Sequence, residues 1–122
     1  MDDFTALIDS HLAAYGEPDS ERRADAVALI WTDDGQLVDP PLAAQGHAQI
    51  VAQADALLAQ FPGHRFQRSS GIDAHHGRLR YAWTLLDPAG QAVLQGTDFA
   101  QVDERGRLAQ VTGFFGSLPG RD

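Results

Sequence analysis

The amino-acid sequence predicts an α+β domain in which three N-terminal helices pack on one face of a curved antiparallel sheet. In the first half of the chain, apolar residues recur at spacings of three and four, which is typical of amphipathic helices. From His64 onward the pattern changes to short apolar strands separated by turns. Turns of two to four residues connect only antiparallel neighbours, so the second half is expected to form a meander.

The first helix is expected to end at Tyr15. Gly16 suits a C-terminal cap and Pro18 cannot continue a helix. The Tyr15 phenol should therefore point from the last turn toward the core. A core tyrosine whose hydroxyl bonds a backbone carbonyl is the alternative to a functional group at this position. The apolar stripe of this helix consists of Phe4, Leu7, Ile8, Leu12 and Tyr15.

Two further helices follow. The second should begin at Asp19 or Ser20, either of which can cap it, and the third should begin after Gly46 and end at Pro62-Gly63. The residues predicted to face inward are Ala24, Val27, Ile30 and Trp31 in the second helix and Ile50, Ala54, Leu57, Leu58 and Phe61 in the third.

A carboxylate ends the short strand predicted between the second and third helices. Residues 33–35, Asp-Asp-Gly, are typical of a turn, and residues 36–39 then form the strand. Pro40 and Pro41 each disfavour helical backbone in the residue before them, and a proline lacks the backbone N–H. The strand is therefore expected to end at Asp39.

Four strands are expected in residues 64–118, and the third contains a second unusual carboxylate. Strand alternation places Asp98 as the one charge in an otherwise apolar row with Gly96. A buried carboxylate must be paired, hydrogen-bonded or protonated. If the row faces the helices, Gly96 would leave room for a ligand. Alternatively, the row faces solvent, or Asp98 bonds a nearby arginine such as Arg80.

Composition restricts the classes of partner. The length of 122 residues fits a single domain spanning residues 1–122, and the absence of cysteine excludes disulfides and thiolate metal sites. A formal net charge of −8 opposes nucleic-acid binding.

No apolar run approaches the length of a membrane span, and the acidic N-terminus is unlike a signal peptide, so a cytoplasmic location is expected. His75 and His76 are adjacent and cannot chelate a metal from one strand face.

These residues resemble those of the NTF2-like superfamily and, within it, of SnoaL-like proteins and ketosteroid isomerases. The resemblance covers nearly the whole chain. It implies a cystatin-like cone of three helices wrapped by a bent antiparallel sheet, with a deep pocket inside and a homodimer formed through the outer sheet surface. The residues that carry it are Tyr15, Asp33-Asp34, Val38-Asp39-Pro40, Gly46 with Ile50, and Asp98 ahead of residues 103–107.

The isomerase resemblance also implies roles for individual residues. Asp39 stands where the general base is expected, and Tyr15 and Asp98 stand where two hydrogen-bond donors to an oxyanion are expected. Phe115 occupies the position of a pocket aromatic. Large core aromatics also line the pocket in a cone fold, so the predicted lining includes Trp31, Phe61 and Trp83. No metal or cofactor is required by this set of residues.

The predicted function is a cofactor-independent isomerase or lyase that transfers a proton on a small apolar carbonyl compound, such as a steroid, polyketide or terpenoid. Two alternatives remain. The same aspartates suit an aldol-type polyketide cyclase, and the pocket could belong to a non-catalytic small-molecule-binding or dimerisation domain. In a catalytic pocket Asp98 should stay protonated near neutral pH, whereas a solvated Asp98 would titrate near about 4.

Overall fold

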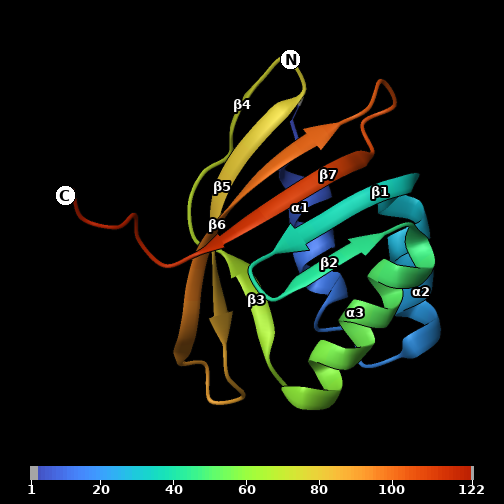
Figure 1. Cartoon of the computed structure of the whole chain (residues 1–122). Helices are drawn as coiled ribbons and strands as arrows, with labels where there is room; N and C mark the ends of the chain where they lie inside the picture. The colour runs from blue at the N-terminus through green and yellow to red at the C-terminus, as the bar shows by residue number, and fades with distance from the viewer. Residues whose placement is uncertain (1–2, 122) are drawn as a thin grey trace.

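The structure is a computed structural model that describes residues 3–121. Within that range three helices cover one face of a seven-stranded mixed sheet whose long strands bend (Figure 1). None of the described helices is long and apolar enough to cross a membrane. The helices are α1 (Thr5–Ala14), α2 (Ser20–Ile30) and α3 (His47–Gln60). The strands are β1 (Trp31–Asp39), β2 (Leu42–Gln45), β3 (Arg65–Arg68), β4 (Asp73–His75), β5 (Arg78–Leu86), β6 (Ala92–Val102) and β7 (Leu108–Phe115).

The three predicted helices are confirmed. Tyr15 caps the C-terminus of α1, and the Gly16 N–H closes the last turn on a backbone carbonyl at 3.0 Å. Asp19 caps α2, because its carboxylate accepts from the backbone N–H groups of Glu21 and Arg22 at 2.9 and 3.2 Å. Gly46 precedes α3 with a φ of 84°, a conformation that favours glycine.

The sheet is mixed, so the prediction of an entirely antiparallel sheet was wrong. Its strand order is β2-β1-β7-β6-β5-β3, with β4 also paired to β5. The pairs β5–β6 and β6–β7 are antiparallel, as the short turns predicted. β1 runs parallel to β7, with Leu37 opposite Val111. Parallel neighbours need a long connection, and all the chain between β1 and β7 provides it here.

β1 begins at Trp31, immediately after α2, and not at Gln36 as predicted. Residues 33–35 lie inside the strand, where the register with β7 shifts between Trp31 and Gln36. Gly35 is buried against the Trp31 ring, and a Cβ on this glycine would collide with that ring. The glycine therefore allows a close approach inside a bulged strand, which is a different use from the predicted turn.

Two short strands also differ from the prediction. β2 follows the two prolines and pairs antiparallel with β1, so that Leu37 lies opposite Ala44. The strand predicted over residues 64–75 is divided into β3 and β4 by residues 69–72. Both β3 and β4 pair with β5, which is long enough to accept them one after the other.

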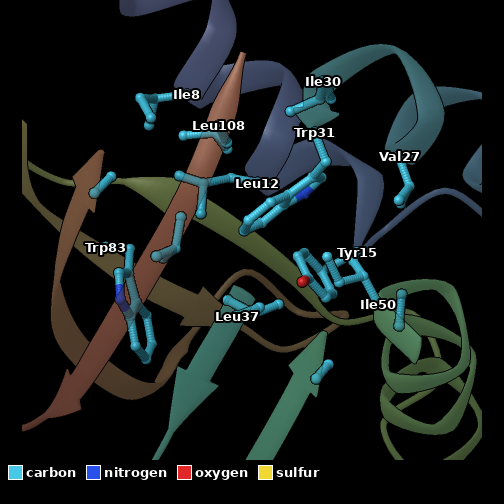
Figure 2. Close-up of a cluster of buried hydrophobic side chains, with 14 of the residues drawn as sticks. Ile8, Leu12, Tyr15, Val27, Ile30, Trp31, Leu37, Ile50, Trp83 and Leu108 are labelled. Atoms are coloured by element: carbon cyan, nitrogen blue, oxygen red, sulfur yellow. The ribbon is translucent and has the colours of Figure 1, made fainter. Parts of the chain in front are cut away.

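The apolar core lies between the helices and the sheet face that they cover (Figure 2). Its most deeply buried side chains come from α1, α3 and the first and last strands, and they fix how these elements pack. They are Ile8, Trp31, Ile50, Leu108 and Val111.

Candidate functional site

A cavity of about 390 Å³ opens on the helix-covered face of the sheet. This volume lies within the range of small-molecule sites. Two helices, α1 and α3, and six strands, β1, β2, β3, β5, β6 and β7, contribute residues to its walls. Most of the lining is apolar. The lining residues with polar side chains are His11, Tyr15, Asp39, Gln53, Gln60, Trp83 and Asp98.

The two predicted carboxylates meet in one row that crosses four strands. On β6, Asp98 lies opposite Tyr81 of β5 on one side and Gly113 of β7 on the other. The parallel register of β1 and β7 brings Asp39 beside Gly113. A Cβ on Gly113 would lie 3.0 Å from Asp98 Oδ1 and 3.3 Å from Asp39 Cβ. Only the backbone of a glycine therefore separates the two acidic side chains.

Asp98 is buried, and each of its two oxygens accepts one hydrogen bond. The Tyr81 hydroxyl donates to Oδ2 at 2.8 Å, and the Trp83 indole N–H donates to Oδ1 at 2.9 Å. Burial raises the Asp98 pKa to about 6, the two hydrogen bonds oppose that rise, and the nearby charge of Asp39 adds to it. The Asp98 pKa therefore lies above the value of about 4 expected for a solvated carboxylate, although at about 6 it leaves Asp98 partly ionised at pH 7.

The role predicted for Gly96 was also wrong. The space left by its missing side chain is occupied by the Trp83 ring, because a Cβ there would lie 2.7 Å from the ring atom Cε2. Gly96 thus lets Trp83 cross β6 and reach Asp98. The alternative partner, Arg80, instead pairs with Asp73 at 2.8 Å on the exposed side of the sheet.

Asp39 ends β1, as the prolines after it predicted. Its side chain is half-buried, and its Oδ1 is buried without a hydrogen-bond partner within residues 3–121. Burial raises the Asp39 pKa, while the backbone N–H of Leu42 acts in the opposite direction. A carboxylate oxygen with no donor beside it is available to a ligand.

Tyr15 reaches the same cavity from the end of α1. Its side chain is buried, and its hydroxyl has no hydrogen-bond partner in the described part of the chain. The expected alternative, a hydroxyl satisfied by a backbone carbonyl, is therefore not found. Burial raises the Tyr15 pKa, and the charges of Asp98 and Asp39 raise it further. In Figure 2 the Tyr15 oxygen lies on the side of Leu37, which also lines the cavity.

Three of the four predicted pocket aromatics, Phe61, Trp83 and Phe115, line the cavity. Trp31 does not, and this prediction needs correction. It is 1% exposed and lies in the core beside Leu12 (Figure 2). The physical reason is the early start of β1, which places Trp31 at the junction with α2, away from the cavity.

Tyr81 was missed by sequence reasoning. The alternation of β5 does place it on the same face as Trp83. Its partner across the sheet depends on a register shift between Leu85 and Leu86. If the pairing at Leu86 had continued without that shift, Arg80 would face Asp98. A single extra residue in the hairpin therefore decides which side chain reaches the carboxylate.

His11 lies in the last turn of α1. It is 2% exposed, lines the cavity and packs edge-on against the rings of Tyr15 and Trp31, each at 5.5 Å. Burial lowers its pKa to about 4, so its imidazole is neutral at pH 7. No group of three or more potential metal ligands is clustered anywhere in residues 3–121.

No protein-family model and no curated protein sequence matches this chain. Solved structures do match. A candidate isomerase of the SnoaL-like family from Agrobacterium tumefaciens is 34% identical, with a TM-score of 0.87 over 92% of this chain and 96% of that one. A protein of unknown function with a cystatin-like fold from Methylobium petroleophilum is 18% identical, with a TM-score of 0.74 over 94% and 76%. A candidate SnoaL-like polyketide cyclase from Jannaschia is 15% identical, with a TM-score of 0.67 over 91% and 85%.

Proposed function

This chain belongs to the SnoaL-like family within the NTF2-like superfamily, and we propose that it is an enzyme that transfers a proton on a small apolar carbonyl compound. One observation carries the proposal. The Tyr15 hydroxyl and Asp39 Oδ1 are buried without partners in the described chain, and both residues line a cavity that also contains Asp98. Each unsatisfied buried polar atom costs about 1–3 kcal/mol. A polar ligand in an apolar cavity accounts for both atoms.

In the proposed reaction Asp39 is the general base. Its carboxylate takes a proton from the carbon next to the carbonyl, and the electron pair of the broken C–H bond moves toward the carbonyl oxygen as an enolate. Tyr15 donates a hydrogen bond to that oxygen. Asp39 then returns the proton to a different carbon, which isomerises the compound without any cofactor. Acid–base catalysis of this kind contributes roughly 100-fold to 10,000-fold.

We assign Asp98 to the same oxyanion as a second donor in its protonated form. Oδ2 accepts from Tyr81, and a protonated Oδ2 retains a proton to donate. With a pKa of about 6, only a minority of Asp98 carries that proton at pH 7. The active form therefore combines an ionised Asp39 with a protonated Asp98, and Tyr15 supplies the donor that is present at every pH in this range.

The same first step supports an aldol-type cyclisation. If the enolate carbon attacks a second carbonyl of the same molecule, a carbon–carbon bond forms and the π electrons of that carbonyl move to its oxygen. The resulting alkoxide then takes the proton from Asp39. The family membership is compatible with either outcome. A substrate that contains two carbonyl groups separates them, because isomerisation and ring closure give different products.

Deuterium exchange in D₂O tests the proposal without knowledge of the final product. A panel of apolar ketones is incubated with the protein, and exchange beside the carbonyl is followed by proton NMR. We expect the wild-type chain to accelerate exchange for at least one ketone and Asp39→Asn to reduce that rate by roughly 100-fold or more. Tyr15→Phe should reduce it by about 100-fold, the usual effect of losing one oxyanion donor.

Asp33→Asn is the matched control, because Asp33 is an exposed aspartate on the same strand as Asp39. It should leave the exchange rate unchanged. Exchange that persists in Asp39→Asn would contradict the assigned base. A wild-type chain that binds ketones but exchanges none of them would favour a binding protein over an enzyme.

A further inference from the structure

The cavity contains negative charge and no compensating cation. Asp39 and Asp98 both line it, and none of its lining residues is an arginine or a lysine. His11, the one basic side chain in the lining, is kept neutral by burial, which lowers its pKa to about 4. Only Gly113 separates the carboxylates, and the charge of Asp39 raises the pKa of Asp98. A positive charge between them would relieve that repulsion.

One wall of the cavity is aromatic. Tyr15 contacts Phe66, Phe66 contacts Trp83, and Trp83 contacts Phe115, each pair edge-to-face with ring centroids 5.8, 5.2 and 5.9 Å apart. All four rings line the cavity. Aromatic rings are attracted to cations more strongly when the contact is shielded from water. The aromatic wall therefore suits an apolar ligand with a positive charge.

The Tyr15 hydroxyl supplies an independent indication of a ligand. Tyr15 is 9% exposed, and its oxygen has no partner within residues 3–121. A phenolic oxygen accepts hydrogen bonds as well as donating them. An ammonium group carries up to three N–H donors and can bond this oxygen and a carboxylate at the same time.

We propose that the cavity binds apolar ligands that carry one ammonium group, with the nitrogen held between Asp39 and Asp98 and the hydrocarbon part against the aromatic wall. Burying a cation is costly unless it is paired, and the two carboxylates provide the pair. By the same reasoning the cavity rejects ligands that carry a carboxylate. This site shares its residues with the proposed enzyme but requires no turnover.

Three compounds with one hydrocarbon cage test the charge preference. They are 1-adamantanamine, which is cationic at neutral pH, 1-adamantanol, which is neutral, and 1-adamantanecarboxylate, which is anionic. Affinities are measured by isothermal titration calorimetry at neutral pH. We expect the amine to bind about tenfold more tightly than the alcohol, since hydrogen bonds to charged groups are stronger than neutral ones. The carboxylate should bind more weakly than the alcohol.

Two variants locate the preference. Asp39→Asn should reduce the affinity for the amine to that for the alcohol. An unchanged affinity for the alcohol shows that the cavity of this variant is intact. Asp25→Asn removes the same charge from the exposed surface of α2. Because the chain has a net charge of −8, this control measures general attraction of cations, and it should keep the tenfold preference.

The inference is overturned if the alcohol binds as tightly as the amine, or if the preference survives in Asp39→Asn. An equal loss in Asp25→Asn would also overturn it, because the preference would then come from the overall charge. As a second measurement, the amine should shift the indole N–H resonance of Trp83, which donates to Asp98. Loss of ketone exchange in Asp39→Asn without any amine preference would leave the enzyme proposal standing and reject only this site.

Discussion

The end of β1 and the middle of β6 each place an aspartate in the same cavity, yet the two surroundings differ. Asp98 is buried among two donors that occupy both of its oxygens. Asp39 is half-buried, and one of its oxygens has no partner in the described chain. Burial raises the pKa of both groups.

The two carboxylates differ both in burial and in hydrogen bonding. The donors make Asp98 part of the structure, because removing it would leave Tyr81 and Trp83 without their acceptor. Asp39 holds nothing comparable in place, so its oxygen is available for chemistry. A buried carboxylate oxygen that costs stability and has no partner is typical of a functional site.

The largest expected effect comes from deleting each carboxylate in turn. Asp98→Ala should lower the free energy of unfolding by on the order of 4 kcal/mol, because two buried donors lose their acceptor at about 1–3 kcal/mol each. Asp39→Ala should change it by less than about 1 kcal/mol, because no donor depends on the unpartnered oxygen. Urea denaturation at neutral pH measures both. Equal losses in the two variants would show that the contrast does not hold.

The next effect concerns pH and isolates Asp98. The Asp98 pKa is about 6 in the folded protein against an ordinary value of 3.8, so between these two values the folded state binds more protons than the unfolded state. The stability associated with this group is therefore fully present below about pH 4 and is lost as the pH rises through about 6. A shift of about two units corresponds to about 3 kcal/mol.

Other carboxylates titrate in the same range, so the comparison is made against Asp98→Asn. Folding raises the pKa of Asp39, as it does that of Asp98, and lowers the pKa values of Asp3 and Asp103. We expect the difference in unfolding free energy between wild type and variant to decline between pH 4 and about 6, and to be flat at higher pH. A difference that grows with rising pH would mean that the Asp98 pKa is lowered by folding.

The smallest effect distinguishes the two tyrosines of the site. Tyr81→Phe removes a donor from Asp98, so it should raise the pKa of that carboxyl and lower the unfolding free energy by about 1–2 kcal/mol. Tyr15→Phe breaks no hydrogen bond within residues 3–121 and should leave stability nearly unchanged. Carbon-detected NMR titration of Asp98 and urea denaturation measure the two quantities. A Tyr15→Phe variant as unstable as Tyr81→Phe would reveal a partner for the Tyr15 hydroxyl.

Local sequence features were sufficient for the helices and for the meander. Caps such as Asp19 and Gly46, and turns of two to four residues, act within a few positions of the chain. The parallel pairing of β1 with β7 could not be predicted, because nothing local in either strand specifies a partner so distant in sequence. The turn expected at residues 33–35 was overridden by tertiary packing, in which Gly35 accommodates the Trp31 ring.

The site was predictable as a set of residue types but not as a network. Asp39, Asp98 and Tyr15 all reach the predicted cavity, although their catalytic roles stay predictions. What holds Asp98 could not be predicted, because the partner depends on the register shift that selects Tyr81 over Arg80. A buried Asp98 was expected to be paired, hydrogen-bonded or protonated, and its two donors oppose the rise in pKa that burial causes.

The parallel pairing of β1 with β7 has a consequence for the order of folding. β5, β6 and β7 are joined by short hairpins, so the donors of Asp98 can assemble early from contacts that are local in the chain. Asp39 arrives only when β1 closes on β7, a non-local contact that carries a larger loop-closure entropy and forms more slowly. Completion of the cavity should therefore coincide with the last folding step. A chain in which β1 has separated from β7 would keep Asp98 in place while Asp39 leaves the cavity.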